Sequence, residues 1–205
     1  MNILALCSAL NNSYLALEKN GEIFSEIIKS DENYHSLYLI EKIKNILENN
    51  NLKMNELDFI AVNVGPGSFT GIRVALTVAK VMAGELNIPL VPLDSVNILL
   101  NAYEADLFLS DARRDMYFIG TKDKIDLIYK DKFDETVNEI SSKKVVCDKR
   151  LSKIVPNSIC YEEHDFDLGK IMLKLAKEKY QNTSNKDIFN PMLIKANYIQ
   201  TPPVF

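Results

Sequence analysis

The chain has 205 residues and a formal net charge of −4 at pH 7, and 47% of its residues are hydrophobic. This length suffices for one large domain or two small ones with an ordinary core, and no apolar run approaches the length that spans a bilayer. The slight negative charge and the lack of a dense Lys/Arg stripe disfavour tight binding to nucleic acid by the chain alone, because that affinity rests on cationic contacts to phosphate.

The start of the chain and its cysteines indicate the compartment. Residues 3–7 have the pattern of a short buried strand, and no basic leader precedes them. Cys7, Cys147 and Cys160 are odd in number and lack CxxC spacing, which is typical of reduced thiols. We therefore expect a cytoplasmic protein that makes no membrane contact.

The first half alternates strands and helices. Strands are predicted at Tyr14–Glu18 and Glu22–Ile28, joined by the tight-turn sequence Lys19-Asn20-Gly21. The elements predicted next are a helix at Ser36–Glu48, a strand at Leu57–Val64, a helix at Phe69–Gly84, a strand at Leu90–Val91 and a helix at Asp94–Tyr103.

The second half repeats the three-strand opening. Strands are predicted at Ala105–Ser110, Met116–Gly120 and Lys124–Lys130, followed by a strand at Lys144–Cys147, a helix at Asp167–Tyr180 and an extended tail at Pro191–Phe205. When Leu107 is aligned with Ile3, Asp111 falls opposite Cys7. The sequence thus predicts an α/β protein of two related lobes with mixed sheets, an N-terminal lobe 1–103 and an abbreviated C-terminal lobe 104–205.

A glycine-rich turn joins the strand that ends at Val64 to the next helix. Gly65 and Gly67 permit positive φ and close backbone approach, and Ser68 is a candidate helix N-cap. A helix N-terminus behind such a turn can bind an anion, so Gly65, Gly67 and Ser68 form a candidate phosphate-contacting turn. The Lys-[Ser/Thr] pair of a P-loop and GxGxxG spacing are both missing, and a purely structural strand-to-helix joint is the alternative.

The helix predicted at Phe69–Gly84 is apolar on two flanks. On a helical projection one flank is lined by Phe69, Ile72, Leu76, Ala79 and Ala83, and the other by Val74, Ala75, Val78, Val81 and Met82. One sheet covers one flank, so the second needs a cover, because each uncovered Ile, Leu or Val forgoes about 1.5–3 kcal/mol. Either a neighbouring helix of the same chain or a second subunit supplies that cover.

No conventional catalytic or metal motif is present. His35 and His164 are the only histidines, and no HxxxH, HExxH or Cys/His cluster occurs, so no metal site and no catalytic residue is expected. The turn Asp111–Asp115 carries four charges between two apolar strands. It is either a solvated hairpin or an arginine pair that binds an acidic or phosphate group, with Asp111 as a further candidate for phosphate contact.

The motif Gly65-Pro-Gly-Ser-Phe-Thr-Gly71, followed by Ile-Arg-Val-Ala-Leu, resembles the signature of the TsaB (YeaZ) family of bacterial tRNA threonylcarbamoyladenosine biosynthesis proteins. The pair His35-Ser36, the turn Asp111-Ala-Arg-Arg and the late Tyr198-Ile-Gln-Thr-Pro202 resemble further landmarks of that family, in the same order. The resemblance covers nearly the whole chain.

The resemblance implies an actin-like ATPase fold, the ribonuclease H-like fold of sugar kinases and Hsp70. It also implies a non-catalytic scaffold that pairs with a TsaD-like paralogue and a TsaE-like ATPase and meets tRNA indirectly through the complex. The apolar flank still needs a cover when the paralogue is absent, so we expect a homodimer when the chain is alone. TsaD carries an HxxxH pattern that this sequence lacks. In the family, the helix after the glycine turn and the helix before it contribute to pairing, which points to these interface residues: Leu37, Ile40, Phe69, Ile72, Leu76 and Val78.

Departures from the family bear on cofactors. Relatives usually have Asp-Thr-Ser after the first strand, whereas this chain has Cys7-Ser8-Ala9, and Gln200 stands where an Arg is usual. In the actin-like fold that Asp helps to hold metal and phosphates, and a thiol is a poor ligand for Mg²⁺. No cofactor is therefore expected. The alternatives are an ATP-dependent small-molecule kinase of the same fold class and a peptidase.

Overall fold

The computed structural model describes residues 1–29, 38–164 and 166–197. The chain divides into two compact units. Unit 1 contains Met1–Ser95 and Asp167–Tyr198, and unit 2 contains Val96–Phe166. This division differs from the lobes predicted from sequence, because the helix after Asp167 packs on the first sheet and not on the second.

Unit 1 is built on a five-stranded mixed sheet. Its strands are β1 (Asn2–Cys7), β2 (Ser13–Lys19), β3 (Glu22–Ile28), β4 (Phe59–Asn63) and β5 (Leu90–Leu93), in the order β3-β2-β1-β4-β5. Strands β1, β2 and β3 pair antiparallel, and β1, β4 and β5 pair parallel. Asn20 and Gly21 join β2 to β3 with positive φ, as the tight-turn sequence predicts.

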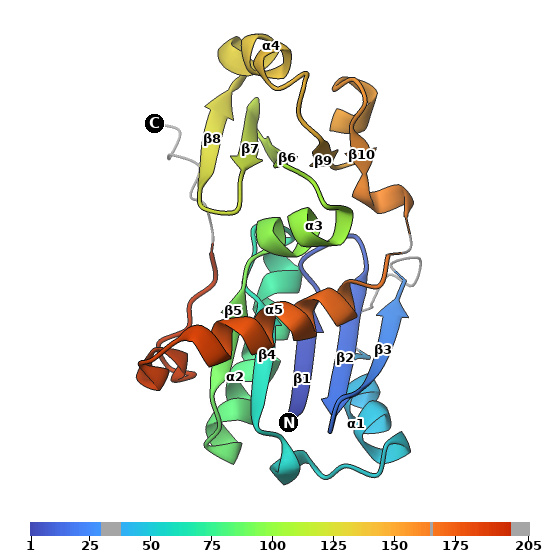
Figure 1. Cartoon of the computed structure of the whole chain (residues 1–205), viewed down its shortest axis with the longest axis vertical. Coiled ribbons are helices and arrows are strands. Elements are labelled where there is room, and N and C mark those ends of the chain that lie inside the picture. The colour runs from blue at the N-terminus through green and yellow to red at the C-terminus, as the bar shows by residue number, and fades with distance from the viewer. Residues whose placement is uncertain (30–37, 165, 198–205) are drawn as a thin grey trace. The chain divides into compact units, whose positions relative to one another are not determined.

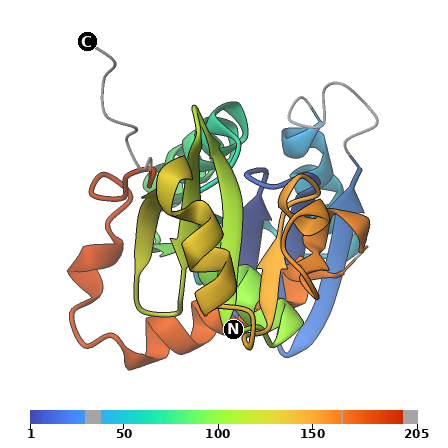
Figure 2. The ribbon, with the colours of Figure 1, turned by 90° about the horizontal axis from the view of Figure 1, so that it is seen from above.

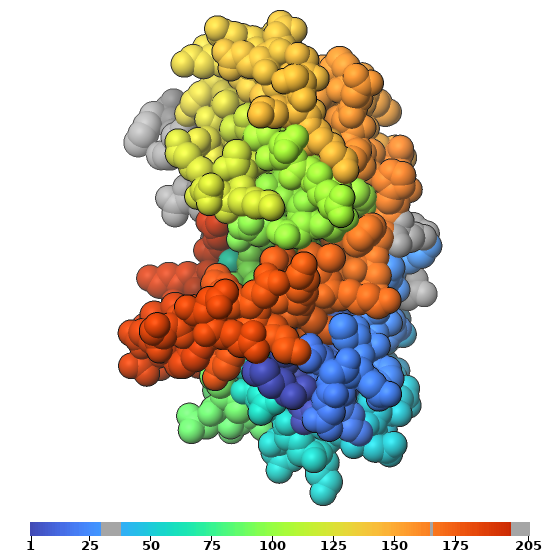
Figure 3. All heavy atoms as spheres, viewed as in Figure 1, coloured from blue at the N-terminus to red at the C-terminus, as the bar shows by residue number. Residues whose placement is uncertain are grey.

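Helices cover both faces of this sheet (Figures 1 and 2). On one face, α1 (Leu39–Asn49) and α2 (Phe69–Leu86) share a core cluster with the strands. The strand residues of that cluster include Leu4, Leu6, Leu15, Leu17, Ile60 and Val62. On the other face lies α5 (Leu168–Asn182), which crosses the strands and leaves the N-terminal hairpin visible beside it (Figure 3). Strands β1, β2 and β4 are therefore buried on both sides, which explains their nearly continuous apolar sequences, whereas the edge strand β3 is partly exposed.

Close packing fixes α5 on its face of the sheet. Its Gly169 lies against Ala16 of β2, since a Cβ built there would be 2.8 Å from the Ala16 methyl group. Tyr180 stacks on Phe59 of β4 with ring centroids 4.7 Å apart.

The segment after α5 returns to the α2 side of the sheet. A short 3₁₀ helix, η4 (Lys186–Phe189), follows α5, and Ile194 then enters the core cluster shared by α1 and α2. The Asn197 N–H donates to the Val64 carbonyl at 2.7 Å, beside the glycine turn. This segment links the two helical layers of unit 1.

Unit 2 repeats the sheet. Its elements are α3 (Ser95–Tyr103), β6 (Leu107–Arg113), β7 (Met116–Gly120), β8 (Ile125–Tyr129), α4 (Lys130–Glu139), β9 (Val145–Cys147) and β10 (Ile159–Cys160), and the strand order is β10-β9-β6-β7-β8. As in unit 1, the first three strands pair antiparallel, and the fourth and fifth continue parallel to the first. The remaining short 3₁₀ helices are η1 (Met54–Glu56) in unit 1 and η2 (Leu151–Lys153) and η3 (Tyr161–Glu163) in unit 2.

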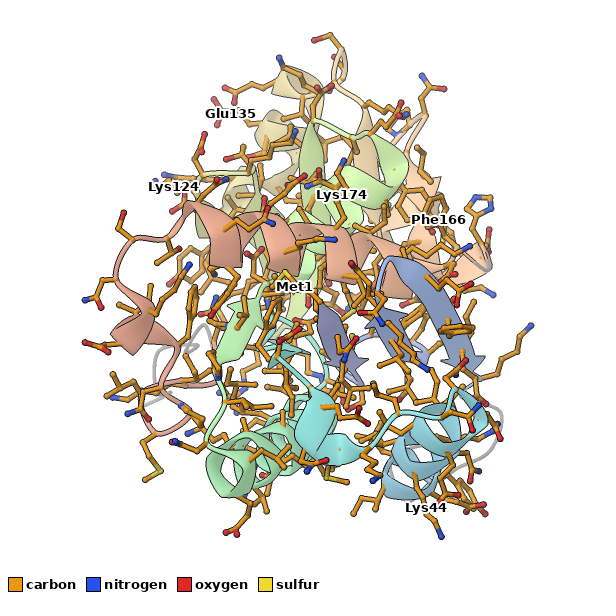
Figure 4. All side chains as sticks on the ribbon, turned by 60° about the horizontal axis from the view of Figure 1, so that its bottom comes forward. Met1, Lys44, Lys124, Glu135, Phe166 and Lys174 are labelled. Carbon is orange, nitrogen blue, oxygen red and sulfur yellow. The ribbon has the colours of Figure 1, made fainter. Side chains whose placement is uncertain are left out.

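The core of unit 2 lies between the sheet and α4. Phe133 and Val137 of α4 pack with Leu109 and Tyr117, and the Tyr117 and Phe133 rings lie 4.1 Å apart. Polar residues on the outer side of α4, such as Glu135, point away from the ribbon (Figure 4).

The predicted fold class is confirmed, because two mixed sheets with the same strand order form an actin-like, ribonuclease H-like pair. The strands at Glu22–Ile28 and Met116–Gly120 have the predicted bounds, whereas α4 and β10 were not predicted. Helix α4 escaped prediction because Phe133 and Val137 are its only apolar residues between Lys130 and Glu139. Within the described residues, no helix is long and apolar enough to cross a membrane.

Candidate functional site

The glycine turn between β4 and α2 uses its own polar groups internally. Gly65 and Gly67 have φ of 105° and 156°, and the Gly65 N–H donates to Asn63 Oδ1 at 2.9 Å. Ser68 is the N-cap of α2, and its Oγ accepts the Gly71 N–H at 3.2 Å. The predicted N-cap is therefore confirmed.

The loop between β1 and β2, residues 8–12, packs directly on this turn. Ser8 Oγ donates to the Gly71 carbonyl at 2.7 Å, and the Ser68 N–H donates to the Ala9 carbonyl at 2.7 Å. A Cβ at Gly67 would lie 2.2 Å from the Ala9 oxygen, and one at Gly71 would lie 1.7 Å from the Ser8 oxygen. Both glycines are thus required by close backbone contact, which favours the structural joint over a phosphate cradle.

A buried polar network ties the same region to the first and fourth strands. The Asn63 side chain is fully buried, and its Nδ2 donates to Cys7 Sγ at 3.2 Å and to Ser95 Oγ at 2.9 Å. The Ser95 N–H donates to the Gly65 carbonyl at 2.9 Å. Burial raises the pKa of the Cys7 thiol, so Cys7 is a neutral thiol at neutral pH.

Unit 2 carries charged groups at the corresponding end of its sheet. Asp148, which follows β9, is 7% exposed and accepts three backbone N–H groups, those of Asp111 at 2.6 Å and of Arg150 and Leu151 at 3.0 Å. The Asp111 carboxylate pairs with the Arg150 guanidinium and also accepts the Arg113 N–H at 2.8 Å. That pairing raises the pKa of exposed Arg150.

The turn between β6 and β7 has an unusual backbone. Arg113, Arg114 and Asp115 have φ of 66°, 52° and 56°, although none is glycine. The ladder has a register shift between Asp111 and Arg113, and the loop proper is Arg114-Asp115. Two-residue loops with positive φ at both positions strongly prefer Asn-Gly or Asp-Gly, and each other residue in this region costs on the order of 1 kcal/mol.

Asp111 is a candidate from the sequence, whereas Asn63, Asp148 and Arg150 were missed. A polar residue directly after a buried strand, as at Asp148, is the signal that could have identified it. Gly65, Gly67 and Ser68 meet in unit 1, and Asp111 belongs to unit 2.

The described residues do not fit the magnesium nucleotide that the actin-like fold implies. At the end of β1 a buried thiol, Cys7, accepts an amide hydrogen bond from Asn63. At the end of β6 the Asp111 carboxylate is held by Arg150, a cation of the chain itself. A hard cation prefers free carboxylate oxygens, and neither strand end offers one. No group of three or more His, Cys, Asp or Glu side chains among the described residues could hold a metal.

The predicted interface residues divide into buried and exposed ones. Ile72 and Leu76 are only 1% and 8% exposed in the core of unit 1, so both of these predicted interface side chains pack inside the chain and not on its surface. They face the sheet because α2 turns the side that carries Ile72, Ala75, Leu76 and Ala79 toward β1 and β4, so the buried side draws on both predicted flanks. Val78 is half-buried against the same core. Leu37, and with it His35, Ser36, Tyr198 and Gln200, lies outside the described residues.

Apolar residues do line the outer surface of the α1–α2 layer. Ile40 of α1 is 67% exposed, and Phe69 and Val81 of α2 are 59% and 60% exposed. The Arg73 guanidinium lies 5.3 Å from the centre of the Phe69 ring. Below, the outer stripe denotes Phe69, Arg73, Thr77 and Val81, which follow one another at four-residue spacing and are all exposed.

Sequence relatives span part of the chain. A TsaB protein, a tRNA threonylcarbamoyladenosine biosynthesis protein, from Buchnera aphidicola subsp. Baizongia pistaciae is 42% identical over 87 residues, which are 42% of this chain and 39% of the relative. The TsaB protein of Bacillus subtilis is 31% identical over 124 residues, 58% of this chain and 54% of the relative. The chain thus spans about half or less of the length of these curated relatives.

A solved structure supports the fold over the whole chain. An uncharacterized protein from Pseudomonas aeruginosa with similarity to peptidase YEAZ superposes with a TM-score of 0.74 at 18% identity, over 97% of this chain and 99% of that one.

The model of one protein family, described as TsaD: tRNA N6-adenosine threonylcarbamoyltransferase, matches residues 22–163, most of the chain. The glycine-turn motif and the named relatives place the chain beside TsaB within that family. The chain belongs to the TsaD family of tRNA threonylcarbamoyladenosine proteins, in its TsaB (YeaZ) group.

Proposed function

We propose that this chain is a non-catalytic scaffold subunit of the complex that installs threonylcarbamoyl on the adenosine adjacent to the anticodon of tRNAs. It acts by binding and supporting a TsaD-type transferase, together with a TsaE-type ATPase, and it pairs with itself when the transferase is absent. The proposal includes no metal and no nucleotide cofactor, and it places the protein in the cytoplasm with its tRNA substrates.

The exposed apolar surface of the α1–α2 layer carries this proposal. Phe69 and Val81 on α2 and Ile40 on α1 are each more than half exposed, although the same helices fill the core with their inner sides. Covering each of these side chains would contribute about 1.5–3 kcal/mol, which is a reason for a second polypeptide to bind there.

The relatives and the sequence support the non-catalytic role. The relatives named above are biosynthesis proteins of the same tRNA modification, and the family also contains the transferase. The sequence lacks the HxxxH pattern that the family resemblance gives to the transferase.

The test is a charge placed on the outer stripe. Val81→Asp should leave the free energy of unfolding within about 0.5 kcal/mol of wild type, because the side chain is 60% exposed. Binding to the TsaD-type protein of the same organism, measured by calorimetry, should weaken at least about 10-fold, because a carboxylate would be desolvated in the interface.

The matched control is Ile23→Asp on β3, a 43% exposed apolar residue of the same unit outside the α1–α2 layer. It should bind the transferase as wild type does. Wild-type affinity in both Val81→Asp and Phe69→Asp would refute the proposed surface. Ile72→Asp is expected to unfold the protein, because Ile72 is buried, and it therefore does not probe the proposed surface.

A further inference from the structure

The turn between β6 and β7 presents two arginines whose charges are not balanced within the chain. The nearest carboxylates have other cationic partners: Asp111 pairs with Arg150, and Asp115 pairs with Lys130 at 3.3 Å. Among the described residues, neither Arg113 nor Arg114 forms an ion pair, and both are exposed. The turn therefore displays two guanidinium groups without internal counter-ions.

The same turn holds these arginines in a defined backbone. Arg113, Arg114 and Asp115 are all left-handed, whereas the ordinary turn of unit 1 uses Asn20 and Gly21 for that conformation. Asp111 accepts the Arg113 N–H, and the first residue of α4, Lys130, donates its N–H to the Asp115 carbonyl at 2.9 Å beside the turn (Figure 1). Strained residues persist where the surroundings fix them, and they concentrate at binding sites.

We propose that Arg113 and Arg114 bind backbone phosphates of tRNA within the modification complex, a direct RNA contact that rests on the proposed function. A guanidinium binds a phosphate through two parallel N–H···O bonds, and a fixed loop limits the entropy lost when it does so. The chain as a whole is negative, so at physiological salt this contact adds to an RNA site supplied by the assembly, and binding by the chain alone is expected only at low salt.

A phosphate fits these observations better than an acidic protein surface. The chain itself already supplies carboxylates for Lys130 and Arg150, and it leaves adjacent arginines for a ligand with closely repeated negative charges. A nucleic acid backbone carries such charges at regular spacing. The alternative is that the two arginines bind an acidic partner protein, and the experiment must distinguish this from binding to RNA.

The test compares Arg113→Gln/Arg114→Gln with wild type. The complex with the TsaD-type transferase is titrated with a labelled tRNA transcript at several potassium chloride concentrations, and fluorescence anisotropy is recorded. The double variant should bind the transcript about 10-fold more weakly at physiological salt, and its salt slope should fall by about 1 to 2 units. Pairing with the transferase, measured without tRNA, should equal that of wild type.

The matched control is Lys122→Gln/Lys143→Gln, which removes two exposed charges from the opposite end of the same sheet, after β7 and before β9. It should bind the transcript as wild type does. Unchanged tRNA affinity and salt slope in the arginine variant would overturn the inference. So would lost pairing with the transferase, since the turn would then bind a protein.

A failure of the proposed function can be distinguished from a failure of this inference. If wild type does not pair with the transferase, the scaffold role is refuted. The same transcript titration on the full chain alone at low salt then decides the role of the turn: a weaker response in the arginine variant supports the RNA contact, and an equal response overturns it.

Discussion

The loop from β1 to β2 and the turn from β6 to β7 occupy the same place in two sheets of the same topology, yet they differ in almost every property. The first is neutral, mostly buried, and sealed by the glycine turn of α2. The second is exposed, charged and left-handed. A repeated sheet can therefore preserve its strand order while its strand ends diverge, because side chains at strand ends contact loops and partners and not the shared core.

The same contrast holds for the residues that end the neighbouring strands of each sheet. In unit 1, Cys7 and Asn63 join neighbouring strand ends through a neutral hydrogen bond. In unit 2, Asp111 and Asp148 join them through a buried carboxylate that accepts a backbone N–H. The strand ends of unit 1 thus form a neutral packing joint, whereas those of unit 2 carry charged side chains.

The largest effect is expected from Gly71→Ala, which tests the close contact between the β1–β2 loop and α2. The added methyl group would lie 1.7 Å from the Ser8 oxygen, so β1 and α2 must separate. The free energy of unfolding should fall by roughly 3 kcal/mol or more, measured by urea denaturation. Gly84→Ala, in the same helix with nothing within 4 Å of its Cβ, is the control and should gain about 0.5–1 kcal/mol. Equal stabilities of the two variants would refute the close contact.

Asp148→Asn tests whether charge organises unit 2. An amide nitrogen would face N–H groups now accepted by a carboxylate oxygen, so the folded state should lose about 2 kcal/mol by thermal or urea unfolding. Lys130→Gln, which removes an exposed ion pair with Asp115, should change stability by less than about 0.5 kcal/mol. If Asp148→Asn has the same free energy of unfolding as wild type, the carboxylate does not stabilise the turn.

Burial of the Cys147 thiol, next to Asp148, predicts that the stability of the protein depends on pH. Desolvation raises the pKa of Cys147 from 9.0 to about 11, so the unfolded thiol ionises first as pH rises. The associated stability is complete below pH 9 and should decline by about 1–2 kcal/mol on approaching pH 11. Urea unfolding of wild type and Cys147→Ala across this range checks it, since the variant should decline less. Parallel curves would contradict the burial.

The smallest effect concerns the strained turn. Arg114→Asn combined with Asp115→Gly supplies residues that accept the left-handed backbone, and it should stabilise the protein by about 1 kcal/mol. Differential scanning calorimetry would detect the shift. A lower melting temperature would mean that the side chains of Arg114 and Asp115 stabilise the fold more than their backbone strain opposes it.

Patterns with strong local causes were predictable from sequence. Period-two apolar strands, the Asn20-Gly21 turn and the Ser68 N-cap depend on neighbouring residues, so the sequence determined the mixed α/β fold and the repeat. The glycine motif also identified the family. Helix α4 was missed because its short apolar stripe is nearly lost among charged residues.

Only the tertiary structure decided which side of α2 faces the core. Both flanks are apolar in sequence, and the buried residues, which include Ile72, Ala75 and Leu76, come from both flanks because the strands they meet determine the covered side. It likewise decided that the helix after Asp167 packs on the first sheet. It also brought together Asp148, which accepts the Asp111 N–H, and Arg150, which pairs with the Asp111 carboxylate. Such outcomes rest on contacts between residues far apart in the chain, which no local pattern encodes.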